Sequence, residues 1–327
     1  MSILVCGGAG YIGSHTVYEL LERGEDVIVL DNLSKGHQEA VPDGIKLCTG
    51  DLRDETFMDS VFSENNIEAV IDFAADSLVG ESVEKPLKYF NNNVYGTLCL
   101  LETMEKYGVK NIVFSSTAAT YGEPENIPIR ETDKTFPTNP YGESKLTVEK
   151  MLKWSDNAYG MKYVVLRYFN AAGAHSSAKI GEDHSPETHL IPLILQVPLK
   201  KREKIYIFGN DYETRDGTCI RDYIHVTDLA DAHILAVEKL RNGGESATYN
   251  LGNGTGFSVK EVIDTVEEVT GEKIAAEVTD RRSGDPATLI AISEKIEKEL
   301  HWKPRFNKLG QIIESAWQWH KNNLDGF

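Results

Sequence analysis

A glycine-rich turn near the amino terminus constrains the fold of this chain more than any other feature of its sequence. Residues 3–6 form an apolar run, glycines recur at every third position over residues 7–13, and a helical pattern follows through Leu21. Glycines at this spacing allow a tight turn, a close approach of backbone amides to a pyrophosphate, and close helix packing. The stretch predicts a strand, a turn and a helix that bind a dinucleotide through Gly7, Gly10, Tyr11, Ile12 and Gly13.

A second apolar run, residues 27–30, ends at Asp31, and Asn32 follows it. A carboxylate about twenty residues after the glycine turn can accept hydrogen bonds from an adenosine ribose. The same carboxylate would repel the additional phosphate of NADP. We therefore predict that the cofactor is NAD and that Asp31 and Asn32 contact it.

Short apolar runs continue at residues 46–49, 69–75 and 111–114, and helical patterns separate them. This alternation predicts an α/β fold with a doubly wound parallel sheet covered on both faces. Ligands of such sheets lie beyond the carboxyl ends of the strands. The residues predicted to line that crevice are Asp51, Leu52, Phe73, Ala74, Ala75 and the turn of Ser115, Ser116 and Thr117.

The pattern loosens from Asn170 onward, where prolines and longer loops become more frequent. The chain has 327 residues, which is enough for two domains. We predict a cofactor-binding domain over residues 1–169, to which residues 221–240 return, and a second, smaller α/β substrate-binding domain built discontinuously from residues 170–327.

Composition limits the partners and the compartment. The formal charge of -17 is spread along the chain, which argues against nucleic acid or an anionic membrane as a partner. The sequence enters its first strand directly after Met1, so we expect a cytoplasmic protein. Its four cysteines are far apart and form no Cys-x-x-Cys pair, which predicts free thiols.

Tyr141 is the only tyrosine with a lysine, Lys145, four residues later. On a helix this spacing puts both side chains on one face, where the ammonium favours the ionised phenol. The phenol then becomes a proton acceptor near neutral pH. Thr117 is expected to approach the same position from the end of its strand.

These features together resemble the extended short-chain dehydrogenase/reductase family, which implies a Rossmann-type fold. The matching residues are the glycine turn, Asp31, the Asn92-Asn93-Val94-x-Gly96-Thr97 segment, Ser115-Ser116-Thr117 and Tyr141-x-x-x-Lys145. Longer segments at residues 79–86, 167–175, 207–212 and 216–226 are similar to the nucleotide-sugar C4 epimerases of that family. The resemblance covers nearly the whole chain.

The resemblance implies reversible epimerisation at C4 of UDP-galactose and UDP-glucose, a step of galactose metabolism, through a transient 4-keto sugar and NADH. Tyr141 would be the base, and Thr117 would share the proton. Lys145 would also hold the nicotinamide ribose. Further cofactor contacts implied by the match are Asn92, Ser115 and Tyr168.

The resemblance also assigns the substrate contacts and an assembly state. Arg221 and Arg282 would bind the UDP diphosphate with Asn170, and Asp285 would bind the uridine ribose. The full implied set is Thr117, Tyr141, Asn170, His189, Leu190, Arg221, Arg282, Asp285 and Leu289. Members of the family are commonly homodimers that pair helices near residues 93–107 and 141–154.

Three departures from the family pattern leave the substrate range open. Ser77 stands where several epimerases carry a lysine near the cofactor, and His189 replaces an asparagine that contacts substrate. Leu289, of intermediate bulk, stands where side-chain size affects the fit of an N-acetyl group. Epimerisation of UDP-N-acetylhexosamines or UDP-pentoses is therefore an alternative.

Other activities fit the sequence less well. A 4,6-dehydratase usually has Asp-Glu just after the threonine, whereas this chain has Ala118 and Ala119. The same absence argues against a decarboxylase, and the family match disfavours a simple alcohol dehydrogenase. An intact Thr117, Tyr141 and Lys145 argue against a non-catalytic NAD-binding regulator.

A metal site is not expected from the sequence. The segment from residue 181 to 189 contains Glu182, His184, Glu187 and His189, but their spacing matches no helical ligand pair. We interpret it as a loop of the substrate domain.

Overall fold

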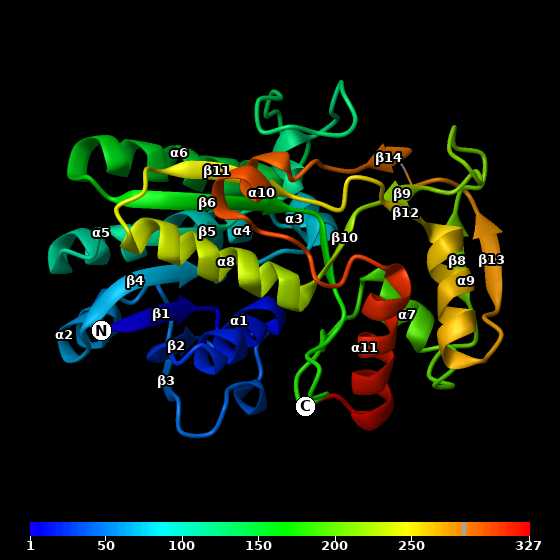
Figure 1. The fold of residues 1–327 in the computed structure, drawn as a ribbon, viewed down its shortest axis with the longest axis horizontal. Coiled ribbons are helices and arrows are strands. Elements are labelled where there is room, and N and C mark those ends of the chain that lie inside the picture. The colour runs from blue at the N-terminus through cyan, green and yellow to red at the C-terminus, as the bar shows by residue number, and fades with distance from the viewer. Residues whose placement is uncertain (283–285) are drawn as a thin grey trace.

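The computed structural model describes residues 1–282 and 286–327. A seven-stranded sheet dominates it, with strand order β11-β6-β5-β4-β1-β2-β3 and every neighbouring pair parallel (Figure 1). The order proceeds outward from β1 in both directions, so the predicted doubly wound sheet is confirmed. Its strands are β1 (Ser2–Cys6), β2 (Val27–Asp31), β3 (Lys46–Thr49), β4 (Ile67–Asp72), β5 (Asn111–Ser115), β6 (Lys162–Tyr168) and β11 (Ala247–Leu251).

Helices cover both faces of this sheet. Alternate residues of β1 belong to two different cores: Ile3 and Val5 pack with α1 and α8, whereas Leu4 and Cys6 pack with α2, α5 and α6. This arrangement explains why the central strands carry apolar residues on both faces. The covering helices are α1 (Tyr11–Glu22), α2 (Glu55–Glu64), α5 (Gly96–Tyr107), α6 (Pro140–Tyr159) and α8 (Val226–Arg241).

Short helical segments connect the strands at the carboxyl edge of the sheet. One of them, η2 (Phe90–Tyr95), is π-helical; it carries Asn92 and leads directly into α5. Such segments often occur at functional sites because they redirect side chains. The other segments are α3 (Val79–Glu84), α4 (Pro86–Tyr89), η1 (Gln38–Ala40) and η3 (Ala118–Tyr121).

The smaller part of the molecule has its own core between α7, α9 and α11, with Ile194, Val266 and Ile312 among its buried residues. Three small sheets surround it, with strand orders β10-β7, β12-β9-β14 and β13-β8. Its helices are α7 (Leu190–Leu195), α9 (Val259–Thr270) and α11 (Leu309–Asn322). Its strands are β7 (Asn170–Ala172), β8 (Ile205–Phe208), β9 (Ile220–Arg221), β10 (Tyr223–His225), β12 (Phe257–Ser258), β13 (Ala276–Thr279) and β14 (Thr288–Leu289).

The chain crosses between the two parts more than once. α8 packs against α1, and β11 then pairs with β6 as an edge strand of the large sheet. The segment that returns to the large sheet therefore extends to Leu251, beyond the predicted residue 240. A further helix, α10 (Glu294–Leu300), also adds Ile296 to that core. Within the described ranges, no helix combines the length and the apolar character that a membrane crossing requires.

Candidate active site

The glycine turn joins β1 to α1 with very little space around it. Gly7 has φ +73°, and a Cβ there would lie 2.8 Å from the backbone nitrogen of Ala74. A Cβ on Gly13 would lie 2.1 Å from the carbonyl oxygen of Gly7. Gly10 caps α1 without a side-chain hydrogen bond, which leaves the amides of the first helical turn for an anion. The turn therefore has no room for side chains at Gly7 and Gly13 and leaves backbone amides free at the start of α1.

Replacing Gly13 by alanine is expected to abolish cofactor retention, because the new methyl group would push the turn away from its position. We expect wild-type protein to purify with a stoichiometric amount of NAD and Gly13→Ala to purify without it. Nucleotide released on denaturation measures this. Gly310→Ala is the matched control, since its Cβ would meet nothing closer than 3.9 Å. Equal NAD content in the two variants would contradict the assignment of the turn.

Asp31 is held in place by backbone amides. Its carboxylate accepts hydrogen bonds from the amides of Ala9 and Leu33, at 2.9 and 2.8 Å. Burial raises the pKa of Asp31, and these hydrogen bonds act in the opposite direction. A carboxylate has about four acceptor positions, so Asp31 can still accept from a ribose.

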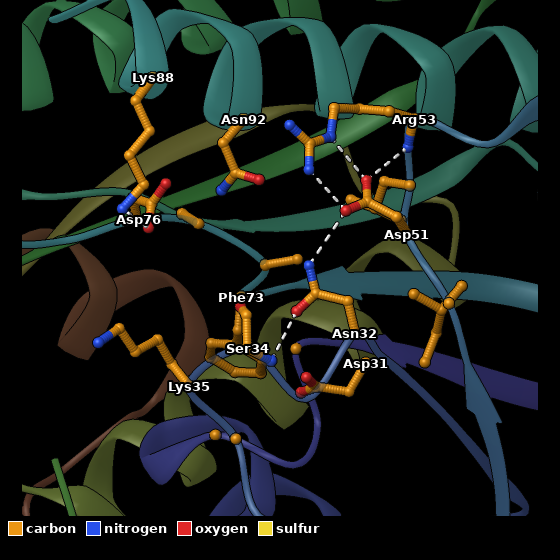
Figure 2. Close-up of a pocket in the computed structure, with 18 residues that line it drawn as sticks. Asp31, Asn32, Ser34, Lys35, Asp51, Arg53, Phe73, Asp76, Lys88 and Asn92 are labelled. Atoms are coloured by element: carbon orange, nitrogen blue, oxygen red, sulfur yellow. Dashed lines mark hydrogen bonds and ion pairs between the residues drawn. The ribbon is translucent and has the colours of Figure 1, made fainter. Parts of the chain in front are cut away.

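A cavity of about 360 Å³ opens at the carboxyl edge of β1, β2 and β4 (Figure 2). Ten of the residues predicted to contact the cofactor line it: Gly7, Gly10, Asp31, Asn32, Asp51, Leu52, Phe73, Ala74, Ala75 and Asn92. The other predicted cofactor residues do not line this cavity: Tyr11, Ile12, Gly13, Ser115, Tyr141, Lys145 and Tyr168.

Arg53 is a residue of this cavity that the sequence analysis did not single out. Its guanidinium donates to both oxygens of Asp51, at 2.7 and 2.6 Å, and Asn32 donates to the same carboxylate at 3.1 Å. The Arg53 hydrogen bonds hold the pKa of Asp51 well below its usual range. The Asp-x-Arg spacing of Asp51 and Arg53 is the only sequence signal for this contact. It does not predict the contact by itself, because the contact also requires the loop after β3 to fold back on itself.

Lys88 and Lys35 bring positive charge to the cavity wall. The ammonium of Lys88 lies 3.2 Å from a carboxylate oxygen of Asp76 and 2.9 Å from one of Glu81 (Figure 2 shows the first pair). Ser77 immediately follows Asp76 in the chain. Position 77 thus has no lysine, and the nearby cation is Lys88, which no sequence pattern indicates.

The start of α6 fixes two of the three residues predicted to be catalytic, Tyr141 and Lys145. Asn139 accepts a hydrogen bond from the amide of Gly142 at 2.9 Å and Pro140 occupies the first turn, which together set where the helix begins. Tyr141 and Lys145 follow one turn apart on the same helix. Thr117, which lies just after β5, is close enough to the Tyr141 phenol to act on its pKa.

The structure changes one part of the expected electrostatics. Lys145 donates to the carbonyl oxygen of Ser115 at 2.8 Å, and its ammonium lies 4.7 Å from the ring centre of Phe114. Burial lowers the pKa of Lys145 to about 8 and raises that of Tyr141, while the hydrogen bond from Thr117 acts to lower the Tyr141 pKa. Burial is therefore the largest effect on the Tyr141 pKa, and it opposes the lowering that the sequence predicts.

Tyr168 and Ser115 complete this group of side chains. Their hydroxyl oxygens are 2.5 Å apart, and both residues are buried. Burial raises the pKa of Tyr168, and the nearby phenol of Tyr141 raises it further. The hydrogen bond with Ser115 acts to lower the pKa of Tyr168, as Thr117 does for Tyr141, but burial has the larger effect on both phenols.

The predicted substrate residues are distributed over the smaller part. Leu289 of β14 pairs with Arg221 of β9, and Arg221 donates to the carbonyl oxygens of Ile220 and Pro286. Asn170 donates to the carbonyl oxygen of Asp222 at 2.8 Å.

The remaining predicted substrate residues occupy three other places. The guanidinium of Arg282 stacks on Phe208 at 3.9 Å from the ring centre. His189 precedes α7, and Leu190 is its first residue. Asp285 lies outside the residues that the structure describes.

Comparison with known proteins identifies the class. Residues 3–252 match the model of the NAD dependent epimerase/dehydratase family. The chain belongs to this family, which confirms the resemblance seen in the sequence and identifies it as an NAD-dependent enzyme.

Within this family, the chain is similar over its full length to UDP-glucose 4-epimerases. The UDP-glucose 4-epimerase of Halalkalibacterium halodurans is 61% identical over 327 residues, which are 100% of this chain and 98% of the relative. That of Streptococcus mutans is 59% identical over 329 residues, covering 100% and 99%.

A solved structure of a UDP-glucose 4-epimerase from Bifidobacterium longum, in complex with NAD+ and UDP, superposes with a TM-score of 0.94 at 42% identity. All of both chains is covered.

Proposed function

We propose that this enzyme interconverts UDP-galactose and UDP-glucose by epimerisation at C4. The grouping of Thr117, Tyr141 and Lys145 beyond β5 supports it, because a hydroxyl, a phenol and an ammonium then surround one substrate position. The names of its full-length relatives support the choice of substrate.

Each polar side chain of that group has a distinct role. Tyr141 takes the proton of the C4 hydroxyl and later returns it, with Thr117 sharing the proton through their hydrogen bond. Lys145 adds positive charge on the same helix face and binds the nicotinamide ribose. Bound NAD supplies the hydride acceptor and donor at C4. Arg221 and Arg282 bind the diphosphate.

The short helix η3 argues against a dehydratase. Thr117 caps it by accepting from the amide of Ala119 at 3.1 Å, and the next residues are Ala118 and Ala119. Ala118 is buried. The start of α6 lies close to Ala119, since a Cβ on Gly142 would come within 2.6 Å of the Ala119 carbonyl oxygen. Methyl groups here provide no acid or base for eliminating water.

Purified enzyme is expected to convert UDP-galactose to UDP-glucose without any added reductant. A coupling dehydrogenase that oxidises UDP-glucose measures the product. The hydride returns to the carbon that lost it, so product formed in deuterated water should carry no deuterium at C4. Substantial labelling at C4, or no UDP-glucose from protein that carries NAD, would contradict the proposal.

We also infer that the enzyme is a homodimer paired through α5 and α6. Tyr95 and Leu98 are exposed at the start of α5, and Trp154 is exposed on α6, which leaves apolar surface on both helices. Light scattering should give the mass of a dimer, and Leu98→Glu should shift it toward a monomer. A monomeric mass for the wild type would contradict this inference.

We infer that the enzyme works in the cytoplasm with a small-molecule UDP-sugar as its partner. All four cysteines are free thiols, and three of them are buried, as expected of a protein kept in a reducing compartment. The formal charge of -17 argues against nucleic acid and anionic membranes as further partners. Cell fractionation tests the location, and recovery in a secreted fraction would contradict it.

A further inference from the structure

Four ionisable side chains converge in the loop that joins β7 to α7. Glu182, His184, Glu187 and His189 each present one potential ligand atom, and these atoms all lie within 4.8 Å of one another. In Figure 1 this loop descends in green toward the carboxyl terminus. The sequence spacing indicated no metal site because no helix pairs these residues; a turn in the loop brings them together instead.

The central member of this cluster is Glu182. Its side chain is 4% exposed, and its Oε1 atom lies 2.7 Å from Nδ1 of His189 and 3.3 Å from Nδ1 of His184. At these separations a hydrogen bond would be expected, yet none of these three atoms has a hydrogen-bond partner of acceptable geometry. These two ring nitrogens and this carboxylate oxygen therefore approach closely and still lack satisfied hydrogen bonds.

Glu187 is oriented by the backbone. Its Oε1 accepts from the amides of Thr188 and His189, at 2.6 and 2.7 Å, and its Oε2 lies 3.6 Å from Nδ1 of His184. The carboxylate therefore faces the same centre as the other three groups. Backbone hydrogen bonds of this kind commonly hold metal-ligating carboxylates in position.

A network of ion pairs alone explains the cluster less well. Buried polar atoms in proteins are nearly always hydrogen-bonded, and a buried ion pair offsets its desolvation only when its geometry is good. Here the buried oxygen of Glu182 and two ring nitrogens lack that geometry. A cation bound between them would satisfy all three atoms at once.

We propose that Glu182, His184, Glu187 and His189 form a binding site for a divalent metal ion, with zinc the best match. Two imidazole nitrogens and two carboxylate oxygens suit tetrahedral zinc, and two carboxylates balance its charge. Because the protein supplies all four ligands, the site is structural rather than catalytic. It replaces the expectation from the sequence that the chain has no metal site.

The position of the loop indicates what the ion stabilises. Lys35, which lines the cofactor cavity, donates to the carbonyl oxygen of Ser185 at 2.7 Å. The amide of Phe327 donates to Asp183 at 3.1 Å. The loop ends at His189, where α7 begins. An ion at this cluster would therefore fix the loop between the cofactor cavity, the carboxyl terminus and the helix predicted to contact the substrate.

Zinc content and stability test the proposal. Untagged protein is stripped with a chelator, dialysed, and titrated with zinc chloride while bound metal is measured by mass spectrometry. We expect one zinc ion per chain for wild type and a rise in Tm on its addition. His184→Asn removes one ligand, so its affinity should fall by more than the about 10–100-fold that loss of an outer-shell partner costs.

His301→Asn is the matched control, because His301 is exposed, lies outside the cluster, and has a left-handed φ of 57° that asparagine tolerates. This control should bind zinc as wild type does. Cobalt provides a second readout, since a tetrahedral site gives it a strong visible absorption that wild type should show and Glu187→Gln should lose. Wild type without a stoichiometric high-affinity zinc site, or His184→Asn binding zinc equally well, would overturn the proposal. Neither readout depends on epimerase activity.

Discussion

Tyr141→Phe is expected to lower kcat for UDP-galactose by about 10²–10⁴-fold, because it removes the proposed proton acceptor. The phenyl ring retains the packing of the tyrosine, including its edge-to-face contact with Tyr89 at 6.5 Å between ring centres. The variant should therefore fold normally and retain its NAD. The coupled assay for UDP-glucose measures kcat, and the nucleotide content is measured on the same preparation.

Tyr159→Phe is the control for this experiment. Tyr159 lies on the same helix, α6, but is exposed at its carboxyl end, and its substitution should leave kcat unchanged. A Tyr141→Phe variant as active as Tyr159→Phe would show that another group accepts the proton. Because Lys145 and Thr117 would remain in place, that result would concern the base alone and not the class of the enzyme.

Much of the fold, and the position of the candidate cofactor cavity, could be predicted from the sequence, because both depend on local pattern. The apolar runs of β1 and β2 are buried at every position in the structure, and Gly7 and Gly13 have the contacts that their spacing implies. In an open parallel sheet, topology then places the strand ends together. Asp31 and Ala74 are therefore found at one cavity although they are far apart in the chain.

Features that depend on tertiary contacts could not be predicted in the same way. His225 ends β10 and is also the cap of α8, where its ring accepts from the amide of Thr227 at 3.2 Å, although the sequence offers Thr227 and Asp228 as the more usual capping residues. Asp228 instead accepts from the amides of Arg305 and Phe306. Both partners are distant in sequence, so no local pattern indicates them.

The pKa of Tyr141 likewise depends on tertiary contacts that the local sequence does not indicate. The spacing to Lys145 is correct, but the direction in which the ammonium points depends on the carbonyl group of Ser115 at the end of another strand. Burial then has the larger effect on the phenol. The sequence predicts which side chains meet, whereas their final hydrogen bonds depend on the packed strands around them.

A buried ion pair behind the candidate active site is such a tertiary feature. Arg167 of β6 donates to both carboxylate oxygens of Glu149 on α6, at 3.0 and 2.5 Å, and to the hydroxyl of Tyr121 at 2.8 Å. Glu149 also accepts from Ser116, the residue before Thr117, at 2.6 Å. The pair therefore links α6, which carries Tyr141, to the ends of β5 and β6.

Arg167→Met should lower the free energy of unfolding by about 3–5 kcal/mol, because it leaves the Glu149 carboxylate buried without its partner. Arg130→Met is the control: Arg130 pairs with Glu294 at the surface, where both side chains are more than half exposed, and such a pair contributes about 0–1 kcal/mol. Urea denaturation with NAD in excess measures both variants under the same cofactor saturation.

The double variant Glu149→Leu with Arg167→Met separates two causes of the loss in stability: the loss of the ion pair itself and the burial of an unpaired carboxylate. With both charges removed, no buried carboxylate remains unpaired, so the double variant should lose less stability than the sum of the two single variants. If Arg167→Met were no more destabilising than Arg130→Met, the pair would not be what holds α6 against the strand ends. The position of Tyr141 would then depend mainly on the Asn139 cap and on the apolar contacts of Val148 and Leu152.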